Sequence, residues 1–366
     1  MDRQPDVPDV ADDARSPFTG TRPVAPQHAF DVARLAAFMH EHVRGFEGEL
    51  AVEQFNGGQS NPTFLLSAGA QRYVLRRKPA GTLLPSAHAV EREFRVIAAL
   101  AATEVPVARA HALCEDPAVI GSAFYVMDFV DGRILWDPTL PGMDAAARAA
   151  HYDEMNRVIA ALHRIEPATV GLADYGKPGH YIERQVARWT RQYRASETER
   201  IEAADALIDW LPRHVPPAGQ ARIVHGDYRL DNVIFDATEP RILAVLDWEL
   251  STLGDPLADF AYHCMRWHLP PPQGLAGADL AALGIPGEAE YLRRYLERVG
   301  AAREPSADEW TYHLVFNMFR LVGILQGVAA RALQGNASSA QAIETGKRAR
   351  PLAEQAWALA QRIGKG

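Results

Sequence analysis

Cysteine and long hydrophobic runs are scarce in this sequence of 366 residues. Its two cysteines, Cys114 and Cys264, lie far apart without metal-ligand spacing, which excludes a disulfide framework and favours reduced thiols. No apolar run approaches the ~20 residues that a helix needs to span a bilayer, so we expect no membrane span. The N-terminus is acidic and rich in proline, unlike a signal peptide. These absences favour a cytoplasmic protein.

Positive charge is also in the minority. The sequence has 38 lysines and arginines against 46 aspartates and glutamates, which gives a formal net charge of −8. This balance disfavours nucleic acids and anionic membranes as partners, because both would repel an acidic protein. With 48% hydrophobic residues, the chain has the composition of an ordinary globular protein. Its length exceeds what one small core needs and predicts two domains or lobes.

The chain divides into a tail and two lobes of different character. Residues 1–25 combine aspartates and prolines with few large apolar groups and predict a disordered or loosely attached tail. Residues 26–130 hold strand patterns separated by glycines and predict a small, β-rich N-lobe. Residues 131–366 predict a larger, mostly helical C-lobe. Its expected helices are 144–165, 180–211, 255–267, 287–299, 307–334 and 338–363. The predicted fold class is α+β.

A short β insertion in the helical lobe carries the most informative motif. Residues 225–232 read His-Gly-Asp-Tyr-Arg-Leu-Asp-Asn, and Leu-Asp-Trp-Glu follows at 246–249. Asp227, Asn232 and Asp247 therefore stand at the spacing of the catalytic loop and metal-binding aspartate of kinases. Phosphoryl transfer to a hydroxyl needs a carboxylate that takes its proton, so we predict Asp227 as the catalytic base. Taken alone, each of the three could simply occupy a turn or cap.

Asn232 and Asp247 offer oxygen ligands of the kind that Mg²⁺ prefers, and we predict both as metal ligands. Glu249 lies two residues beyond Asp247 and would face the same side of an extended segment, so it is a candidate substrate or metal contact. A solvated glutamate is the alternative. His225 is expected to shape the loop, and Asp259 to hold it by accepting backbone hydrogen bonds.

The front half supplies candidates for nucleotide binding. Glycines between two strands let backbone N–H groups approach phosphates, although a hairpin turn explains the same residues. The candidates in this loop are Gly57, Gly58, Ser60 and Asn61. The strand at 124–129, which Asp131 and Gly132 follow, has the character of a hinge between lobes. We expect Asp128 and Val130 to lie beside an adenine there, and a plain buried strand is the alternative.

Arg76 ends a strand-like segment, Tyr-Val-Leu-Arg, at the place where kinases carry a lysine. We expect Arg76 to contact the nucleotide phosphates and to pair with a glutamate on the following helix. Glu93 is the preferred partner, and Glu91 is the alternative. Arginine keeps the charge of lysine but differs in shape and reach.

A predicted helix in the C-lobe carries a basic face that could receive an acceptor. Arg184, Arg188 and Arg191 fall at positions i, i+4 and i+7 and share this face, and Trp189 is adjacent. In a protein of net charge −8, such a face would suit an anionic substrate. A solvated surface is the alternative.

Together these motifs resemble the aminoglycoside phosphotransferase-like superfamily, which includes choline kinases and is distantly related to protein kinases. The resemblance covers about residues 30–340. Segments 57–61, 73–79 and 245–256 are most similar to the kinase-like domain of acyl-CoA dehydrogenase fusion proteins and its free-standing bacterial relatives. The resemblance implies a two-lobed protein-kinase-like fold, ATP with Mg²⁺ as donor, and a hydroxyacyl-CoA as a candidate acceptor. Arg76 departs from the lysine that most of this superfamily carries.

We therefore expect an ATP- and Mg²⁺-dependent phosphotransferase that acts on a hydroxyl group of a small molecule. An anionic acyl-CoA-like acceptor is favoured over an aminoglycoside, because the candidate acceptor helix is basic. Such an enzyme could act alongside an acyl-CoA dehydrogenase. One alternative is a catalytically weak nucleotide-binding pseudokinase, which the substitution at Arg76 would support. Another is a kinase of aminoglycosides or amino alcohols.

Overall fold

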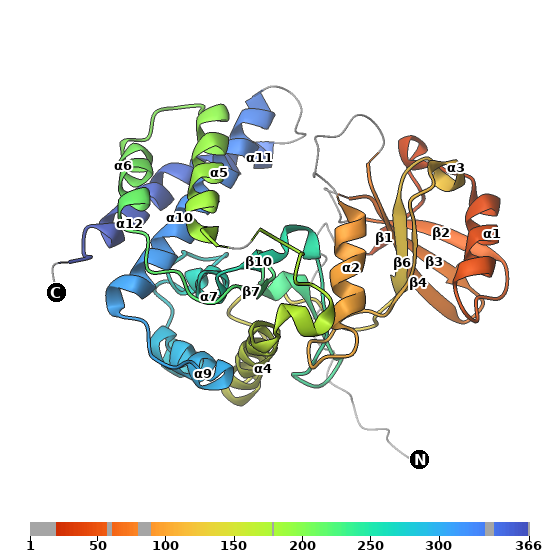
Figure 1. Ribbon diagram of the computed structural model, residues 1–366, viewed down its shortest axis with the longest axis horizontal. Helices are drawn as coiled ribbons and strands as arrows, with labels where there is room; N and C mark the ends of the chain where they lie inside the picture. The colour runs from red at the N-terminus through yellow and green to blue at the C-terminus, as the bar shows by residue number, and fades with distance from the viewer. Residues whose placement is uncertain (1–19, 57–60, 80–88, 178, 334–339, 365–366) are drawn as a thin grey trace, which may run out of the picture. The chain divides into compact units, whose positions relative to one another are not determined.

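The computed structural model describes residues 20–56, 61–79, 89–177, 179–333 and 340–364. The chain forms two compact units, whose elements are labelled in Figure 1. The first unit runs to Arg133 and also includes Pro141–Met143 and Leu243–Glu249. The second contains the remaining residues from Ile134 onward. The Asp-Trp-Glu segment at 247–249, which we expected in the C-lobe, therefore groups with the β-rich unit.

The first unit is built on a six-stranded sheet in the order β1-β2-β3-β4-β6-β5, with antiparallel neighbours. Its strands are β1 (Thr21–Arg22), β2 (Leu50–Phe55), β3 (Thr63–Ala68), β4 (Gln71–Arg77), β5 (Ala110–Cys114) and β6 (Phe124–Asp128). Its helices are α1 (Val32–His42), α2 (Val90–Leu100) and α3 (Pro117–Ile120). The mixture of strands here and helices in the second unit confirms the predicted α+β class.

Two strands of this sheet were not predicted. Thr21 pairs with Phe55 in β1, so structure begins within the stretch that we expected to be a loose tail. The β5 sequence, Ala-His-Ala-Leu-Cys, contains no β-branched residue and gives little strand signal. Pairing with β6 imposes the extended conformation there instead.

Alternation along β4 gives the sheet two different faces. Leu75 is buried in a core cluster with Leu35 and Met39 of α1. Arg76 points to the opposite face, because successive side chains of a strand alternate. There it meets Glu93, which is buried on α2. The sheet thereby places one cation on the face that its apolar core does not use.

The second unit is mainly helical. Its helices are α4 (Ala145–Arg164), α5 (Tyr181–Ala195), α6 (Glu202–Trp210), α7 (Pro256–Cys264), α8 (Leu280–Leu283), α9 (Glu288–Val299), α10 (Ala307–Leu333), α11 (Ala340–Lys347) and α12 (Ala349–Ala360). Between α6 and α7 lie the short strands β7 (Arg222–Val224), β8 (Val233–Phe235), β9 (Ile242–Val245) and β10 (Thr252–Gly254). Of β9, only Ile242 belongs to this unit, and its other residues group with the first unit. Strands β7 and β10 pair antiparallel, with Val224 opposite Thr252.

Two of the expected helices are each divided in two. The predicted helix 180–211 ends at Ala195, because the Ser196 amide and hydroxyl both bond the carbonyl of Gln192 and close the last turn. The predicted helix 338–363 divides into α11 and α12 on either side of Arg348, which is the N-cap of α12.

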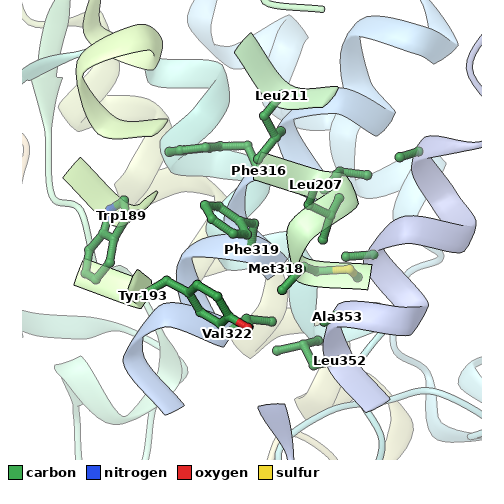
Figure 2. Packing of buried hydrophobic residues seen from close by; sticks show 14 of the residues in the cluster. Trp189, Tyr193, Leu207, Leu211, Phe316, Met318, Phe319, Val322, Leu352 and Ala353 are labelled. Carbon is green, nitrogen blue, oxygen red and sulfur yellow. The ribbon is translucent and has the colours of Figure 1, made fainter. Parts of the chain in front are cut away.

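Helix α10 lies at the centre of the helical core. Figure 2 shows Phe316 and Phe319 of α10 packed among Trp189 of α5, Leu207 of α6 and Leu352 of α12. This helix is long and apolar enough to cross a membrane by length and composition, contrary to our expectation from the sequence. In the structure, 72% of its most apolar window is buried, as in the core helix of a globular domain.

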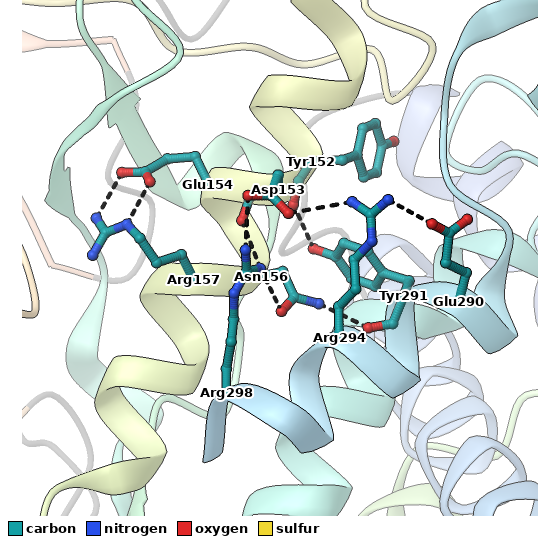
Figure 3. A network of polar contacts seen from close by, with 9 residues as sticks. All are labelled: Tyr152, Asp153, Glu154, Asn156, Arg157, Glu290, Tyr291, Arg294 and Arg298. Carbon is teal, nitrogen blue, oxygen red and sulfur yellow. Dashed lines mark hydrogen bonds and ion pairs between the residues drawn. The ribbon is translucent and has the colours of Figure 1, made fainter. Parts of the chain in front are cut away.

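A polar network joins α4 to α9 beside this core (Figure 3). Asp153 accepts from Arg294 at 3.2 Å and from Arg298 at 2.7 Å. Asn156, fully buried, donates from Nδ2 to the carbonyl of Tyr291 at 2.8 Å. The network fixes α4, whose neighbouring Met155 carbonyl accepts the hydroxyl of Tyr228 at 3.0 Å. It thus supports the loop that carries the His-Gly-Asp motif.

Candidate active site

The loop after β7 is held by one buried carboxylate. Asp259 of α7 accepts the backbone N–H of His225 at 2.7 Å and that of Gly226 at 2.8 Å, as the sequence led us to expect. Burial alone would raise the pKa of Asp259, but hydrogen bonds from His163 and His225 hold that pKa below its ordinary value. Asp255 caps α7 by accepting the N–H of Leu257 and fixes the start of this helix. Asp259 therefore acts as an ionised anchor for the loop.

Gly226 is required by this loop for two reasons. Its φ is +83°, in the left-handed region that glycine adopts readily. A Cβ added there would lie 2.8 Å from the carbonyl oxygen of Leu250. His225 is fully buried, and its Nδ1 accepts the N–H of Asp227 at 3.1 Å. The histidine therefore shapes the loop, as expected.

The carboxylate of Asp227 is fixed at both oxygens. Oδ1 accepts the hydroxyl of Tyr262 at 2.5 Å, and Oδ2 accepts Nδ2 of Asn232 at 2.9 Å. The same Nδ2 also donates to the Asp227 carbonyl at 2.8 Å. With 18% of its side chain exposed, Asp227 remains open to a second molecule. A held but accessible carboxylate is what proton abstraction from a hydroxyl needs.

Asn232 has an orientation that suits a metal ligand. It is 8% exposed, and both hydrogen bonds to Asp227 use its amide nitrogen. The amide oxygen must then point away from Asp227, which leaves it as an oxygen donor of the type that Mg²⁺ prefers.

In the first unit, the guanidinium of Arg76 forms ion pairs with three carboxylates. Arg76 Nε lies 2.9 Å from Glu93 Oε2, and its Nη2 lies 2.6 Å from Asp247 Oδ1 and 3.7 Å from Glu249 Oε2. Burial alone would lower the pKa of Arg76, but the three carboxylates raise it above its ordinary value, so the side chain stays charged. Glu93 is the preferred partner that the sequence suggested. Glu91 instead pairs with Lys78 at 2.8 Å.

Glu93 is almost completely buried, with 1% of its surface exposed. Its oxygens accept from Nδ2 of Asn61 at 2.8 Å and from the hydroxyl of Tyr125 at 3.1 Å. Burial raises the pKa of Glu93 to about 7, although Arg76 opposes the shift. Asn61, expected in a phosphate loop, is fully buried and fixes Glu93 instead. The other loop candidates, Gly57, Gly58 and Ser60, lie outside the described residues.

Asp247 has the left-handed backbone conformation, with φ at +61°. Non-glycine residues rarely adopt it, and such strain is concentrated at functional sites. The ion pair with Arg76 and the hydrogen bond from Trp248 Nε1 to the Val245 carbonyl, at 3.0 Å, hold the segment in place. Arg76 contacts one carboxylate oxygen of Asp247, and the Asp247 side chain is one-third exposed. The second carboxylate oxygen of Asp247 could bind a metal ion.

The end of β6, expected as a hinge, has part of its backbone already paired. The Asp128 amide donates to the Arg109 carbonyl at 2.9 Å, and the Phe129 amide donates to the Arg72 carbonyl at 3.2 Å. The Asp128 carboxylate lies 2.6 Å from His111. Val130 follows the strand and is half-buried. Its backbone is thus the better candidate for an adenine contact than the amide of Asp128.

A cavity of about 480 Å³ opens beside Asp227 in the second unit. Tyr262 and Arg229 line it, and both contact Asp227. The other lining residues come from distant segments: Trp136, Asp137, Asp231, Met265, Arg266, Leu269, Pro272, Gln273, Leu321, Leu325 and Arg348. Its volume is in the range of small-molecule sites. A substrate in it could present a hydroxyl to the carboxylate of Asp227.

Comparison with known proteins identifies the family. Residues 51–296 match the model of the phosphotransferase enzyme family, APH, which is more than half of the chain. The chain belongs to this family. Mouse acyl-CoA dehydrogenase family member 10 is 47% identical over 321 residues, which cover 87% of this chain but 30% of the mouse protein. The chain thus spans about a third of that relative's length.

Solved structures agree with this assignment. A Ralstonia eutropha protein, described provisionally as an aminoglycoside phosphotransferase, is 57% identical with a TM-score of 0.84, over 91% of this chain and 99% of that one. A mutant of the phosphotransferase APH(4)-Ia, crystallised with AMP-PNP and hygromycin B, is 17% identical with a TM-score of 0.59, over 89% and 98%. The second likeness shows the fold alone. The expected superfamily and kinase-like fold are confirmed.

The basic face expected on α5 is only partly present in this family member. Arg184 donates to the carbonyls of Gly179 and Lys177, the latter at 2.7 Å, and so closes the turn before its own helix. Trp189 is 5% exposed and packs in the core, which corrects its expected place beside an acceptor. The helical period turns it inward while Arg188 stays exposed.

The sequence did not lead us to several residues around the His-Gly-Asp loop. Tyr262 lies three residues after Asp259 on α7, so both share one helix face, and this spacing was a usable signal. Arg320 of α10 donates to the Gly226 carbonyl and lies 4.7 Å from the centroid of the Tyr262 ring. No local pattern in the sequence of α10 could have indicated that contact, because it depends on how α10 packs on α7.

Proposed function

We propose that this chain is an ATP- and Mg²⁺-dependent kinase that phosphorylates a hydroxyl group of a small molecule. The observation that carries the proposal is the carboxylate of Asp227, which is oriented by Tyr262 and Asn232 and contacts two residues, Tyr262 and Arg229, that line a ligand-sized cavity. Membership of the phosphotransferase family supports the reaction class. The structure of APH(4)-Ia with AMP-PNP supports an adenine nucleotide as donor.

In this proposal Asp227 orients the acceptor hydroxyl and accepts its proton as the bond to phosphorus forms. Asn232, through its amide oxygen, and Asp247, through its carboxylate, are the proposed ligands of Mg²⁺. When bound, the metal ion would neutralise charge on the transferred phosphoryl group. Arg76 holds Asp247 and is the proposed cation for the nucleotide phosphates. Val130 is the proposed backbone contact of the adenine.

We further propose that the acceptor is an anionic acyl compound, with a hydroxyacyl-CoA as the leading candidate. Relatives named acyl-CoA dehydrogenases support this, and so does the cavity, which combines apolar walls with three arginines. The partner would then be the small-molecule acceptor alone or an acyl-CoA dehydrogenase acting on the same compounds. The net charge of −8 supports our expectation that the protein binds neither nucleic acid nor an anionic membrane.

Two other functions are supported by single observations. The substitution of lysine by Arg76 favours a weakly active pseudokinase. Similarity to APH(4)-Ia favours an aminoglycoside kinase, and the cavity includes Asp137 and Asp231, but Asp231 is already paired with two arginines. The carboxylate of Asp227, which two hydrogen bonds hold in place, argues against the pseudokinase.

The test is Mg²⁺-dependent phosphoryl transfer from ATP to a panel of hydroxyacyl-CoAs, hydroxy acids, amino alcohols and aminoglycosides. We expect turnover with hydroxyacyl compounds and a loss of at least ~10³-fold in Asp227→Asn, with nucleotide binding retained. Asp209→Asn, at an exposed position on α6, removes the same charge away from the cavity and should retain activity. If Asp227→Asn and the wild type are equally inactive with every acceptor, the kinase proposal fails.

A further inference from the structure

The wall of the cavity contains an arginine that the catalytic loop does not account for. Arg229 and Arg266 both line the cavity, and both are paired with Asp231, at 2.6 and 3.1 Å. Arg348 lines the same cavity from the start of α12. Among the residues that the structure describes, its guanidinium makes no hydrogen bond or ion pair. The five N–H groups of its guanidinium can therefore bind a molecule in the cavity.

This position is unfavourable for a cation that has only a structural role. Arg348 is half-buried, and burial lowers its pKa because the charged form loses water. A guanidinium that has lost part of its water gains more from an anionic partner than a fully exposed one does. The missing counterpart would be an anion.

The rest of the cavity indicates what accompanies that anion. Met265, Leu269 and Leu325 are core residues, exposed by 3%, 6% and 4%, and they form an apolar part of the lining. Tyr262 and Arg229 connect the lining to the carboxylate of Asp227. A single molecule in this space would meet a base, an apolar surface and an unpaired cation.

We propose that Arg348 binds an anionic group of the acceptor, a carboxylate or a phosphate, and thereby determines acceptor specificity. The acceptor would place its carbon chain against Met265, Leu269 and Leu325 and its hydroxyl at Asp227. This inference rests on the proposed kinase function, but the arginine can be tested by binding alone. The acceptor's charge would then be recognised in the cavity by Arg348, and not by the exposed Arg188 on α5.

The experiment measures equilibrium binding by calorimetry to the full chain loaded with Mg²⁺ and a non-hydrolysable ATP analogue. Three probes share one hydroxylated medium-length carbon chain: the free hydroxy acid, its CoA thioester and the uncharged diol. The variants are Arg348→Gln, Arg348→Lys and the control Arg350→Gln. Arg350 lies two residues further on α12 and is paired with Glu199 at 2.6 Å, outside the lining of the cavity. Thermal melting confirms that each variant folds.

We expect Arg348→Gln to weaken binding of the anionic probe by roughly 10- to 100-fold, the usual value of a charged hydrogen bond. Arg348→Lys should lose less, because it keeps the charge but not the planar fork. The diol should bind both proteins alike. A selective loss for the free acid would identify the anion as a carboxylate, and a selective loss for the thioester would identify a CoA phosphate.

Three results would overturn the proposal: no probe binds the wild type, Arg350→Gln weakens binding as much as Arg348→Gln, or the diol is affected equally. Turnover of the same probes, measured in parallel, separates this inference from the kinase proposal. Binding that depends on Arg348 without phosphoryl transfer would contradict the kinase function and leave the anion site standing. Phosphoryl transfer that is unchanged in Arg348→Gln would contradict the anion site and leave the kinase function standing.

Discussion

Replacing Tyr262 by phenylalanine is the sharpest test of how the base is positioned. The change removes one hydroxyl, which donates to Asp227 Oδ1 at 2.5 Å, and keeps the ring beneath the Arg320 guanidinium. Burial and the charge of Asp227 both raise the pKa of Tyr262, so the hydroxyl stays protonated and donates throughout the assay range. Tyr262 does not transfer a proton; it is a positioning residue.

The size of the effect follows from the kind of hydrogen bond. An O–H to carboxylate bond of this length is charge-assisted, and such bonds contribute about 1.5–3 kcal/mol. When this bond is lost, the ionised carboxylate loses its fixed alignment with the acceptor hydroxyl. Since 1.36 kcal/mol corresponds to a factor of ten in rate, kcat should fall by roughly 10- to 100-fold.

The assay measures kcat and KM separately for Tyr262→Phe. We expect kcat to fall, with the KM for ATP unchanged. Tyr312→Phe is a matched control, since Tyr312 is also buried in the second unit and donates to the Leu211 carbonyl at 3.0 Å. A kcat that is unchanged in Tyr262→Phe, or that falls equally in Tyr312→Phe, would refute the reasoning.

Two further predictions concern the supports of the site. Gly226→Ala forces a Cβ against the Leu250 carbonyl at positive φ and should lower the melting temperature and kcat, at a cost of about 1–3 kcal/mol; Gly219→Ala, with open space around it, should change neither, and equal effects would contradict the account. The raised pKa of Glu93, about 7, lies above its unfolded value of 4.5, so the folded protein binds the extra proton and loses stability as pH rises between them. Glu93→Gln should flatten that decline in melting curves between pH 5 and 8, and an unchanged slope would disprove it.

The features that the sequence predicted well are those set by neighbouring residues. Asp227 and Asn232 stand five positions apart in one loop, so their spacing alone brings the amide to the carboxylate. The preference for Glu93 over Glu91 also held, because only one of them faces β4 from α2. Helical periodicity places Trp189 inside the core, whereas our prediction placed it beside an acceptor because of the arginines around it.

The cavity could not have been predicted in the same way. Its lining combines Trp136, Tyr262, Leu321 and Arg348, which are separated by dozens of residues and meet only through helix packing. No periodic signal marks such a set. Arg348 in particular lies where one long helix was expected, and the break between α11 and α12 places it at a helix start.

Arg76, whose departure from lysine suggested a pseudokinase, has a structural explanation within the first unit. A lysine ammonium is one compact centre, whereas the guanidinium reaches Glu93 through Nε and Asp247 through Nη2 at the same time. The 243–249 segment groups with the β-rich unit, and Asp247 has a strained backbone that needs such a partner. Arginine therefore fixes the proposed metal ligand to the sheet. On this reasoning the substitution favours a rigid site and does not indicate an inactive one.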